Sequence, residues 1–511
     1  MSLNEILTLP TVGFLFFLFA QGPFRGWLIL IASVICLFWL QPSVPIRYFD
    51  FWLPLLTLWG TCFVWLVTFP KNVHPSRSDA FTGILIIVLI LAIGFTRYLN
   101  SVPFITASLP PTLNTISIRL LIGLLLFFIF FVIRKKTGGL PAVFFSTVIL
   151  ILITLLIFLK APVLTLLLAK GLRLSAGQNP ELATAFDIRW IGFSYIAFRL
   201  IHTLRDRLSG KLQEYDLRTF VNYIIFFPSI VAGPIDRIER FAGDYRKSEQ
   251  PILSTDIALA QSASNLAVIG PPIRLGKIWS RFRTDDVIVQ ACQLLILGLF
   301  KKFVLADTLA LIALNPTNAL QVQAAGWLWL LTYFYAFQIY FDFAGYTDIA
   351  IGLGLLLGVR LPDNFSAPYR KTNLTLFWNA WHISLTQWLR VYLFNPLVRS
   401  LRSKKMPAVT VLLIGQVVTM LVIGLWHGIT WNYLIWGLWH GLGQFIQNRW
   451  SDWVKPWFAS RTLTPIQTLM LRWINIGLTF NYVALGWVWF LLPSPDLAVQ
   501  VFQRLFGIRF N

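Results

Sequence analysis

Long runs of apolar residues recur along the whole chain. Clear examples cover residues 51–69, 81–95, 118–133 and 141–169. A helix needs about 20 apolar residues to cross the hydrocarbon core of a bilayer. No alternating apolar and polar strand pattern competes with these runs, so helices must satisfy the backbone. Counted with weaker runs, the pattern predicts an all-α, polytopic membrane protein with roughly 11–13 transmembrane or re-entrant helices.

The composition agrees with a membrane protein and explains the charge. Hydrophobic residues make up 57% of the chain, charged residues 12%, and the net charge is +21. The basic residues cluster in loops between apolar runs, at 134–136, 205–211, 237–247, 274–283 and 399–405. Such an excess marks cytoplasmic loops, which lie beside anionic lipid head groups. We therefore expect membrane lipids, and no nucleic acid, as partners of these loops.

The distribution of polar residues predicts two parts. Residues 1–180 contain apolar runs joined by short loops and are expected to form an N-terminal transmembrane scaffold. Residues 181–511, which place polar groups inside apolar segments, are expected to form the functional core. Residues 248–286 predict a surface loop with an interfacial helix. The cysteines Cys36, Cys62 and Cys292 are too scattered for a disulfide framework, and we assign no metal site.

Three interrupted apolar segments are candidates for function, because polar groups inside a membrane are costly. Residues 226–234 contain two prolines and a glycine, and a backbone broken in this way must be buried in protein or line a cavity. Residues 340–352 contain Asp342 and Asp348 with two tyrosines. Residues 364–451 contain three of the five histidines.

The histidine segment has an unusual charge pattern. His382, His427 and His440 lie there with eight lysines or arginines and no aspartate or glutamate. The segment therefore supplies no carboxylate for a Ser-His-Asp relay or for a zinc protease site. Burial disfavours the charged imidazolium, so these rings are expected to accept protons. That chemistry suits a general base acting on an alcohol.

The pentapeptide Gly-Leu-Trp-His-Gly occurs twice, at residues 424–428 and 437–441. On an ideal helix the two copies would be rotated by about 220°, so we expect at most one of His427 and His440 to share a site with His382. For His440, a buried core position is an equal alternative. For His382 and His427 a functional role is favoured, because both interrupt apolar runs with polar and aromatic residues.

Together these segments resemble the membrane-bound O-acyltransferase family, and most closely its bacterial branch that modifies alginate and teichoic acid. The resembling stretches are Asn-Phe-Ser-Ala-Pro-Tyr at 364–369, residues 377–390, the two pentapeptides with Trp431 between them, and residues 226–234 and 340–352. The resemblance implies a ring of helices around a central funnel or tunnel. It places His427 on the family's essential histidine and His382 on the second histidine.

The same resemblance implies a function. We expect transfer of an acyl group, acetyl in the first instance, from a cytoplasmic thioester to a hydroxyl of an exported polysaccharide or cell-envelope glycan. The donor, acyl-CoA or an acyl carrier, is a substrate, and no bound cofactor is expected. An extracytoplasmic transferase is an expected partner, and the inner (plasma) membrane of a bacterium is the expected location, with several membrane passes.

Further residues are candidates for shaping the tunnel, although helix packing or capping is an equal alternative for the first four of them. They are Asn364, Tyr369, Asp342, Asp348, Trp381, Trp431 and His440.

The chain departs from the branch at Asn379-Ala380 and at Val391, where the branch has charged residues. Acids and bases are missing together, which fits the loss of a whole set of buried ion pairs. The surface that contacts the donor or a partner can therefore differ from that of the branch. Two alternatives also stay open: a lipid acceptor such as a lysophospholipid or sterol, and a secondary transporter, which would require repeated hydropathy halves.

Overall fold

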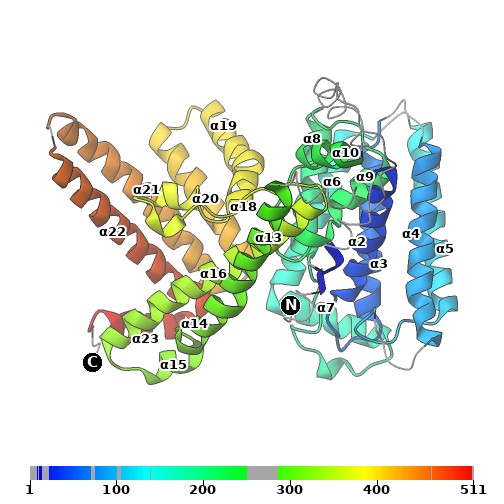
Figure 1. Cartoon of the computed structure of the whole chain (residues 1–511), viewed down its shortest axis with the longest axis horizontal. Helices are drawn as coiled ribbons and strands as arrows, with labels where there is room; N and C mark the ends of the chain where they lie inside the picture. The colour runs from blue at the N-terminus through cyan, green and yellow to red at the C-terminus, as the bar shows by residue number, and fades with distance from the viewer. Residues whose placement is uncertain are drawn as a thin grey trace, which may run out of the picture. The chain divides into compact units, whose positions relative to one another are not determined.

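The computed structural model describes residues 8–9, 11–13, 22–70, 75–99, 105–137, 140–249, 286–461 and 463–508 (Figure 1). Within these residues the fold is all-α, with a single isolated β-bridge between Phe365 and Trp381. The α-helices are α2 (Arg25–Trp39), α3 (Phe49–Thr68), α4 (Arg77–Phe95), α5 (Leu113–Lys136), α6 (Ala142–Lys160), α7 (Pro162–Ser175), α8 (Phe193–Leu208), α9 (Leu217–Ile224), α10 (Ile238–Glu249), α13 (Asp286–Leu299), α14 (Asp307–Ile312), α15 (Pro316–Gln321), α16 (Ala325–Leu356), α17 (Leu374–Trp378), α18 (Ile383–Leu389), α19 (Asn395–Ser403), α20 (Ala408–His427), α21 (Trp431–Ala459), α22 (Pro465–Leu491) and α23 (Pro495–Leu505).

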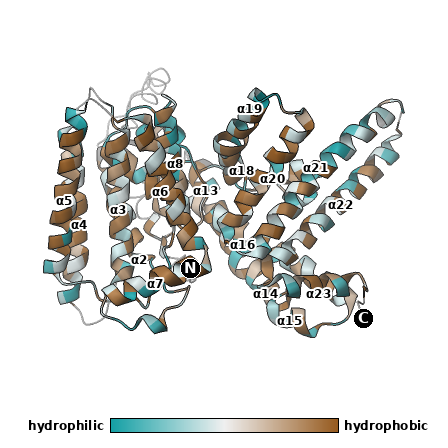
Figure 2. Ribbon diagram, turned by 180° about the vertical axis from the view of Figure 1, so that it is seen from behind, coloured by the Kyte–Doolittle hydropathy of each residue, from teal (hydrophilic) through white to brown (hydrophobic). Residues whose placement is uncertain are grey.

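Seven of the described helices are long and apolar enough to cross a membrane: α3, α4 with the short turn that follows it, α5, α6, α16, α20 and α22. Apolar residues predominate along α4 and α5 (Figure 2). On α5, Leu125 and Phe128 expose 58% and 63% of their surface. Exposing this much apolar surface to water costs free energy, whereas lipid can cover it without that cost. The predicted all-α, multi-pass fold is confirmed. The predicted count of segments also included short pieces, such as the 15-residue apolar helix α2.

The chain forms two compact units. The first contains residues 1–155, 163–296 and 348–361, and the second contains residues 156–162, 297–347 and 362–511. Helices α6, α13 and α16 contribute to both. These units do not follow the expected boundary at residue 180, so the division into scaffold and functional core stays a prediction about role. The loop expected at 248–286 lies largely outside the described residues.

The interrupted segment at 226–234 follows a helix end in the first unit. Helix α9 stops at Ile224, and residues 227–229 form one turn of 3-10 helix. The buried side chain of Arg199 donates to the carbonyls of Tyr223, Ile224 and Ser229 at 3.3, 2.8 and 3.2 Å, and to the Ser229 hydroxyl at 2.6 Å. One guanidinium therefore satisfies carbonyls that the broken helix would leave unpaired.

The two pentapeptides lie on an antiparallel pair of helices in the second unit. A Cβ on Gly424 of α20 would approach the Tyr433 carbonyl oxygen to 2.2 Å, and one on Gly437 of α21 would approach the Met420 oxygen to 2.8 Å. The glycines thus let the two backbones touch, a common device in membrane helices. Because α20 ends at His427 and α21 begins at Trp431, the rotation expected on a single helix does not apply.

Candidate active site around two histidines

His382 lies in a tight turn between α17 and α18 and has a left-handed backbone, with φ of 45°. This conformation is costly for a residue with a side chain. The turn is held by Asn364, whose side-chain oxygen accepts hydrogen bonds from the Ser384 N–H at 3.2 Å and the Ser384 hydroxyl at 2.6 Å. The Asn364 carbonyl also accepts from the Ile383 N–H at 3.0 Å. Asn364 therefore fixes the backbone of the two residues that follow His382.

The His382 imidazole is buried among aromatic rings. It packs edge-on against Phe343, with 4.7 Å between ring centres, and against Trp426 at 6.1 Å. Both ring nitrogens are buried and make no hydrogen bond within the part of the chain that the structure describes. An imidazole in such surroundings is held neutral and keeps one donor and one acceptor for a ligand.

His427 is the last residue of α20, where the hairpin turns. Its ring lies 4.7 Å from the Trp426 ring and 4.8 Å from Phe490, centre to centre. The backbone of the turn is anchored by a hydrogen bond of 2.9 Å from the Ile429 N–H to the Lys160 carbonyl. The end of α20 is thereby tied to the end of α6.

Trp426 links the two histidines. Its indole contacts both imidazoles, so their centres are separated by no more than the sum of those two contact distances. On the same indole lies the Lys160 ammonium, 5.7 Å from the ring centre. Neither histidine forms an ion pair with a carboxylate within the described ranges. The site thus combines two imidazoles and one cation, and no described carboxylate pairs with either imidazole.

His440 lies deeper in the aromatic packing, on α21. It is fully buried and contacts Trp436, Trp378 and Trp487 at 4.9, 5.1 and 6.3 Å between ring centres. Trp436 also contacts His427 at 5.9 Å. His440 therefore contacts the same Trp436 indole as His427. Among the described residues, no ring contact joins His440 to His382.

Tyr369 and Trp381 belong to the same aromatic packing, with 5.8 Å between their rings. The Tyr369 hydroxyl donates to the Ala336 carbonyl at 2.7 Å and accepts from the Trp487 indole at 3.2 Å. Its hydrogen-bonding capacity is therefore largely used within the protein, as in a packing role. Trp381 contacts Trp487 at 5.0 Å and is 4% exposed.

For three of the predicted tunnel residues, the described part of the chain gives no contact with the histidines, and their role stays a prediction. Asp342 forms an ion pair with Lys302 of the π-helical turn after α13. Asp348 belongs to the first compact unit and is not placed relative to the histidines. Trp431, the first residue of α21, is 71% exposed. The ion pair of Asp342 is a local structural role that the sequence could not supply.

The sequence analysis missed three contributors. Lys160 was assigned to a scaffold helix, because nothing in its neighbourhood along the chain distinguishes it from other basic residues at helix ends. Trp426 and Trp436 were passed over as residues beside the histidines, although each Trp-His pair is adjacent or i, i+4 in sequence. The repeated Trp-His dipeptide was the available signal.

Comparison with known proteins now adds to this geometry. Residues 110–487 match the model of the membrane-bound O-acyltransferase family. The chain is 30% identical to teichoic acid D-alanyltransferase of Streptococcus thermophilus over 59% of its own length and 68% of that protein. It is 32% identical to a probable alginate O-acetylase of Pseudomonas aeruginosa, over 65% of this chain and 54% of that protein.

A third relative, peptidoglycan O-acetyltransferase of Helicobacter pylori, is 30% identical over 59% of this chain and 50% of its own length. The chain thus spans about half the length of these two relatives. The family inferred from the sequence motifs is confirmed, and the enzyme class that it implies is an acyltransferase. The chain belongs to the membrane-bound O-acyltransferase family.

Proposed function

We propose that this protein transfers an acyl group, acetyl in the first instance, from a cytoplasmic thioester to a hydroxyl of an exported polysaccharide or cell-envelope glycan. The thioester would be acyl-CoA or an acyl carrier. An extracytoplasmic transferase would be a partner of the membrane protein. The location would be a bacterial inner membrane. Relatives named for alginate, peptidoglycan and teichoic acid support this class of acceptor.

The observation that carries the proposal is the pair of imidazoles on one indole. In the proposed reaction His427 accepts the hydroxyl proton while the hydroxyl oxygen attacks the thioester carbonyl carbon. The new C–O bond forms as the carbonyl electrons move to oxygen, where the N–H of His382 donates a hydrogen bond. When the carbonyl reforms, the C–S bond breaks and the thiolate takes the proton from His427.

Lys160 supplies the positive charge that the two neutral rings lack. Negative charge develops first on the carbonyl oxygen and then on the leaving sulfur. An ammonium on the Trp426 ring is close enough to stabilise one of these charges where water is excluded. Replacing Lys160 by methionine keeps much of the shape and removes the charge, so turnover should fall while donor binding by other contacts remains.

The test uses the full chain in lipid nanodiscs with labelled acetyl-CoA and a cell-envelope polysaccharide fraction. His427→Ala and His382→Ala are expected to lower transfer by about 100-fold or more without lowering the melting temperature of the protein. Trp453→Ala is the matched control, because this α21 residue is 72% exposed and lies outside the site.

The outcomes separate the alternatives. Unchanged acyl transfer by His427→Ala would remove the proposed role of this histidine. Preference for long-chain donors with a lysophospholipid or sterol product would replace the glycan acceptor by a lipid. Substrate movement across the nanodisc or vesicle membrane without thioester cleavage would favour a transporter instead.

A further inference from the structure

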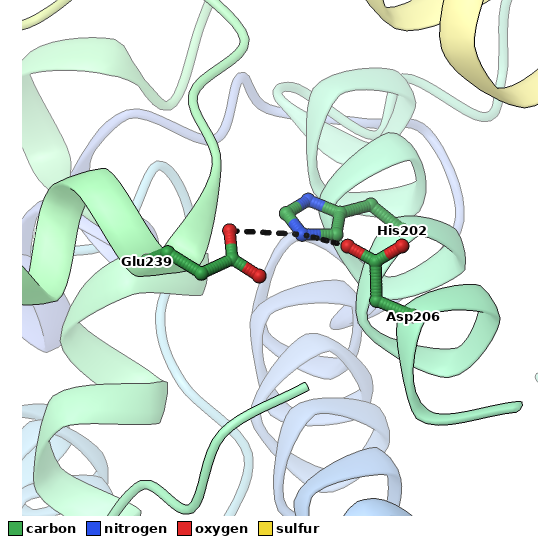
Figure 3. A group of neighbouring side chains, drawn as sticks. All are labelled: His202, Asp206 and Glu239. Atoms are coloured by element: carbon green, nitrogen blue, oxygen red, sulfur yellow. Dashed lines mark ion pairs between the residues drawn. The ribbon is translucent and has the colours of Figure 1, made fainter. Parts of the chain in front are cut away.

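A second group of polar side chains lies in the first unit, apart from the two histidines of the candidate active site. His202 and Asp206 come from α8 at i, i+4, and Glu239 comes from the first turn of α10; the three converge in Figure 3. His202 Nε2 lies 3.3 Å from Asp206 Oδ2 and 3.9 Å from Glu239 Oε2. One ligand atom from each residue falls within 4.8 Å of the others.

Hydrogen bonding on the far side of the ring favours the tautomer of His202 that carries its proton on Nδ1. The Tyr223 hydroxyl donates its one proton to the Asp236 carbonyl at 2.8 Å. The same oxygen lies 3.2 Å from His202 Nδ1, so it accepts from that nitrogen. Nδ1 therefore bears the ring proton, and a neutral His202 directs the lone pair of Nε2 toward the two carboxylates.

Three acceptor atoms consequently face one another. Both carboxylate oxygens of Glu239 are buried and accept no hydrogen bond from any described residue. Arg237 neutralises part of the charge, with its guanidinium 3.1 Å from Asp206 Oδ2 and 3.6 Å from Glu239 Oε2. The Arg237 side chain is 51% exposed. It approaches the carboxylates from the solvent side and can withdraw.

We propose that His202, Asp206 and Glu239 bind a divalent transition-metal ion, with zinc preferred. One imidazole nitrogen and two carboxylate oxygens are ligands that zinc accepts, and a fourth position would be left for water. Two ligands of a tetrahedral zinc ion lie about 3.3 Å apart, which matches the His202–Asp206 separation. Glu239 Oε2 has to move about 0.6 Å closer to His202 Nε2 to reach the same separation, and the partial exposure of this side chain leaves room for that movement.

The surroundings match a metal site in one more respect. Histidines that ligate metals almost always donate their other N–H to a fixed acceptor, and the Tyr223 hydroxyl is that acceptor here. The ion would join α8 to α10, the helix that follows the break at residues 226–234. Its expected effect is to stabilise the turn whose carbonyls Arg199 holds.

The competing explanation is a proton in place of a metal. If His202 were an imidazolium, its second N–H would pair with the carboxylates, and the cluster would be an internal ion pair. The two explanations differ in what Arg237 does. A guanidinium that shares the carboxylates competes with a metal, so removing it should strengthen metal binding, whereas it has no such effect on a site that binds only a proton.

The test uses the full chain, purified through a tag without histidine, stripped with chelator and exchanged into metal-free buffer. Zinc binding is measured by calorimetry and by metal content, and cobalt is added as a spectroscopic probe for a tetrahedral site. We expect one zinc ion per chain and visible cobalt absorption. Tyr223→Phe should weaken zinc binding by about 10- to 100-fold, and Glu239→Gln by at least as much.

Two further variants make the result decisive. Arg237→Ala should bind zinc more tightly than the unmodified chain. Asp244 lies on the same helix as Glu239 but pairs with Arg240. The variant Asp244→Asn should therefore bind zinc as the unmodified chain does. Absence of stoichiometric zinc binding by the folded chain, or equal affinity in Glu239→Gln of unchanged melting temperature, would overturn the proposal.

Discussion

Replacing Asn364 by alanine tests how the His382 ring is positioned. The Asn364 side chain is fully buried, and its oxygen accepts from both the backbone N–H and the hydroxyl of Ser384. A buried donor left without an acceptor costs about 1–3 kcal/mol. The hydroxyl can rotate, but the N–H cannot. We therefore expect the free energy of unfolding to fall by about 1–3 kcal/mol.

The effect on turnover should be separate from the effect on stability. Hydrogen bonds to Asn364 hold the turn that contains the left-handed backbone of His382. A displacement of about 1 Å at a reacting group can lower the rate by about 100-fold. The assay measures thiol release from acetyl-CoA in nanodiscs, at a temperature where circular dichroism shows the variant folded. Asn364→Ala should then lower the turnover number by about that factor.

Asn373→Ala is the control for this prediction. Asn373 caps α17 by accepting from the Leu376 N–H at 2.8 Å and is more exposed, so its loss should cost about 1 kcal/mol and leave turnover near normal. In the double variant Asn364→Ala/His382→Ala, the asparagine change should have no further effect on rate. Turnover within twofold of the unmodified chain in Asn364→Ala would refute the positioning role.

Three further changes test the fold around the sites. Arg199→Met should lower the free energy of unfolding by about 3 kcal/mol or more, because buried carbonyls lose a charged donor; urea titration would contradict this if the midpoint stayed put. Gly424→Ala should destabilise the hairpin and reduce turnover, whereas Gly477→Ala on α22, where a Cβ meets nothing within 4 Å, should be neutral or stabilising by up to about 1 kcal/mol. Melting temperatures of the two alanine variants decide the point. Asp187 is desolvated, which alone would raise its pKa, but hydrogen bonds from Arg173 and Thr184 lower the pKa below the usual value. Its contribution to stability is therefore present above the ordinary aspartate pKa and lost as pH falls through the lowered one. Asp187→Asn should accordingly flatten the acid side of the melting temperature against pH, and an unchanged profile would contradict the assignment.

The helices and the histidine segment were predictable because they depend on local pattern. Runs of apolar residues indicate spans wherever they occur, and the repeated Gly-Leu-Trp-His-Gly drew attention to His427 and His440. The glycines had a use that periodicity alone did not reveal, since they allow two helices to touch. The pair was first considered on a single helix, and only the turn at residues 428–430 corrects that assumption.

Contacts between distant segments could not be predicted in the same way. Lys160 reaches Trp426 only because the turn after α20 bonds to the end of α6. Asp342 was a candidate for the tunnel or for helix packing, and its ion pair with Lys302 joins segments that are distant in the sequence. The group around His202 escaped notice for the same reason. Its third member, Glu239, follows two prolines and a glycine in the sequence and meets α8 only in the folded chain.

The indole of Trp426 has a consequence for how two ligands would sense each other. Because the same ring contacts His382 and His427, we expect that in the proposed reaction a molecule that shifts one imidazole also moves the indole and, through it, the other imidazole. Occupancy on the two sides is then thermodynamically linked, and each ligand changes the affinity of the other by the same factor. Fluorine-labelled tryptophan at this position would give a single resonance that responds to both.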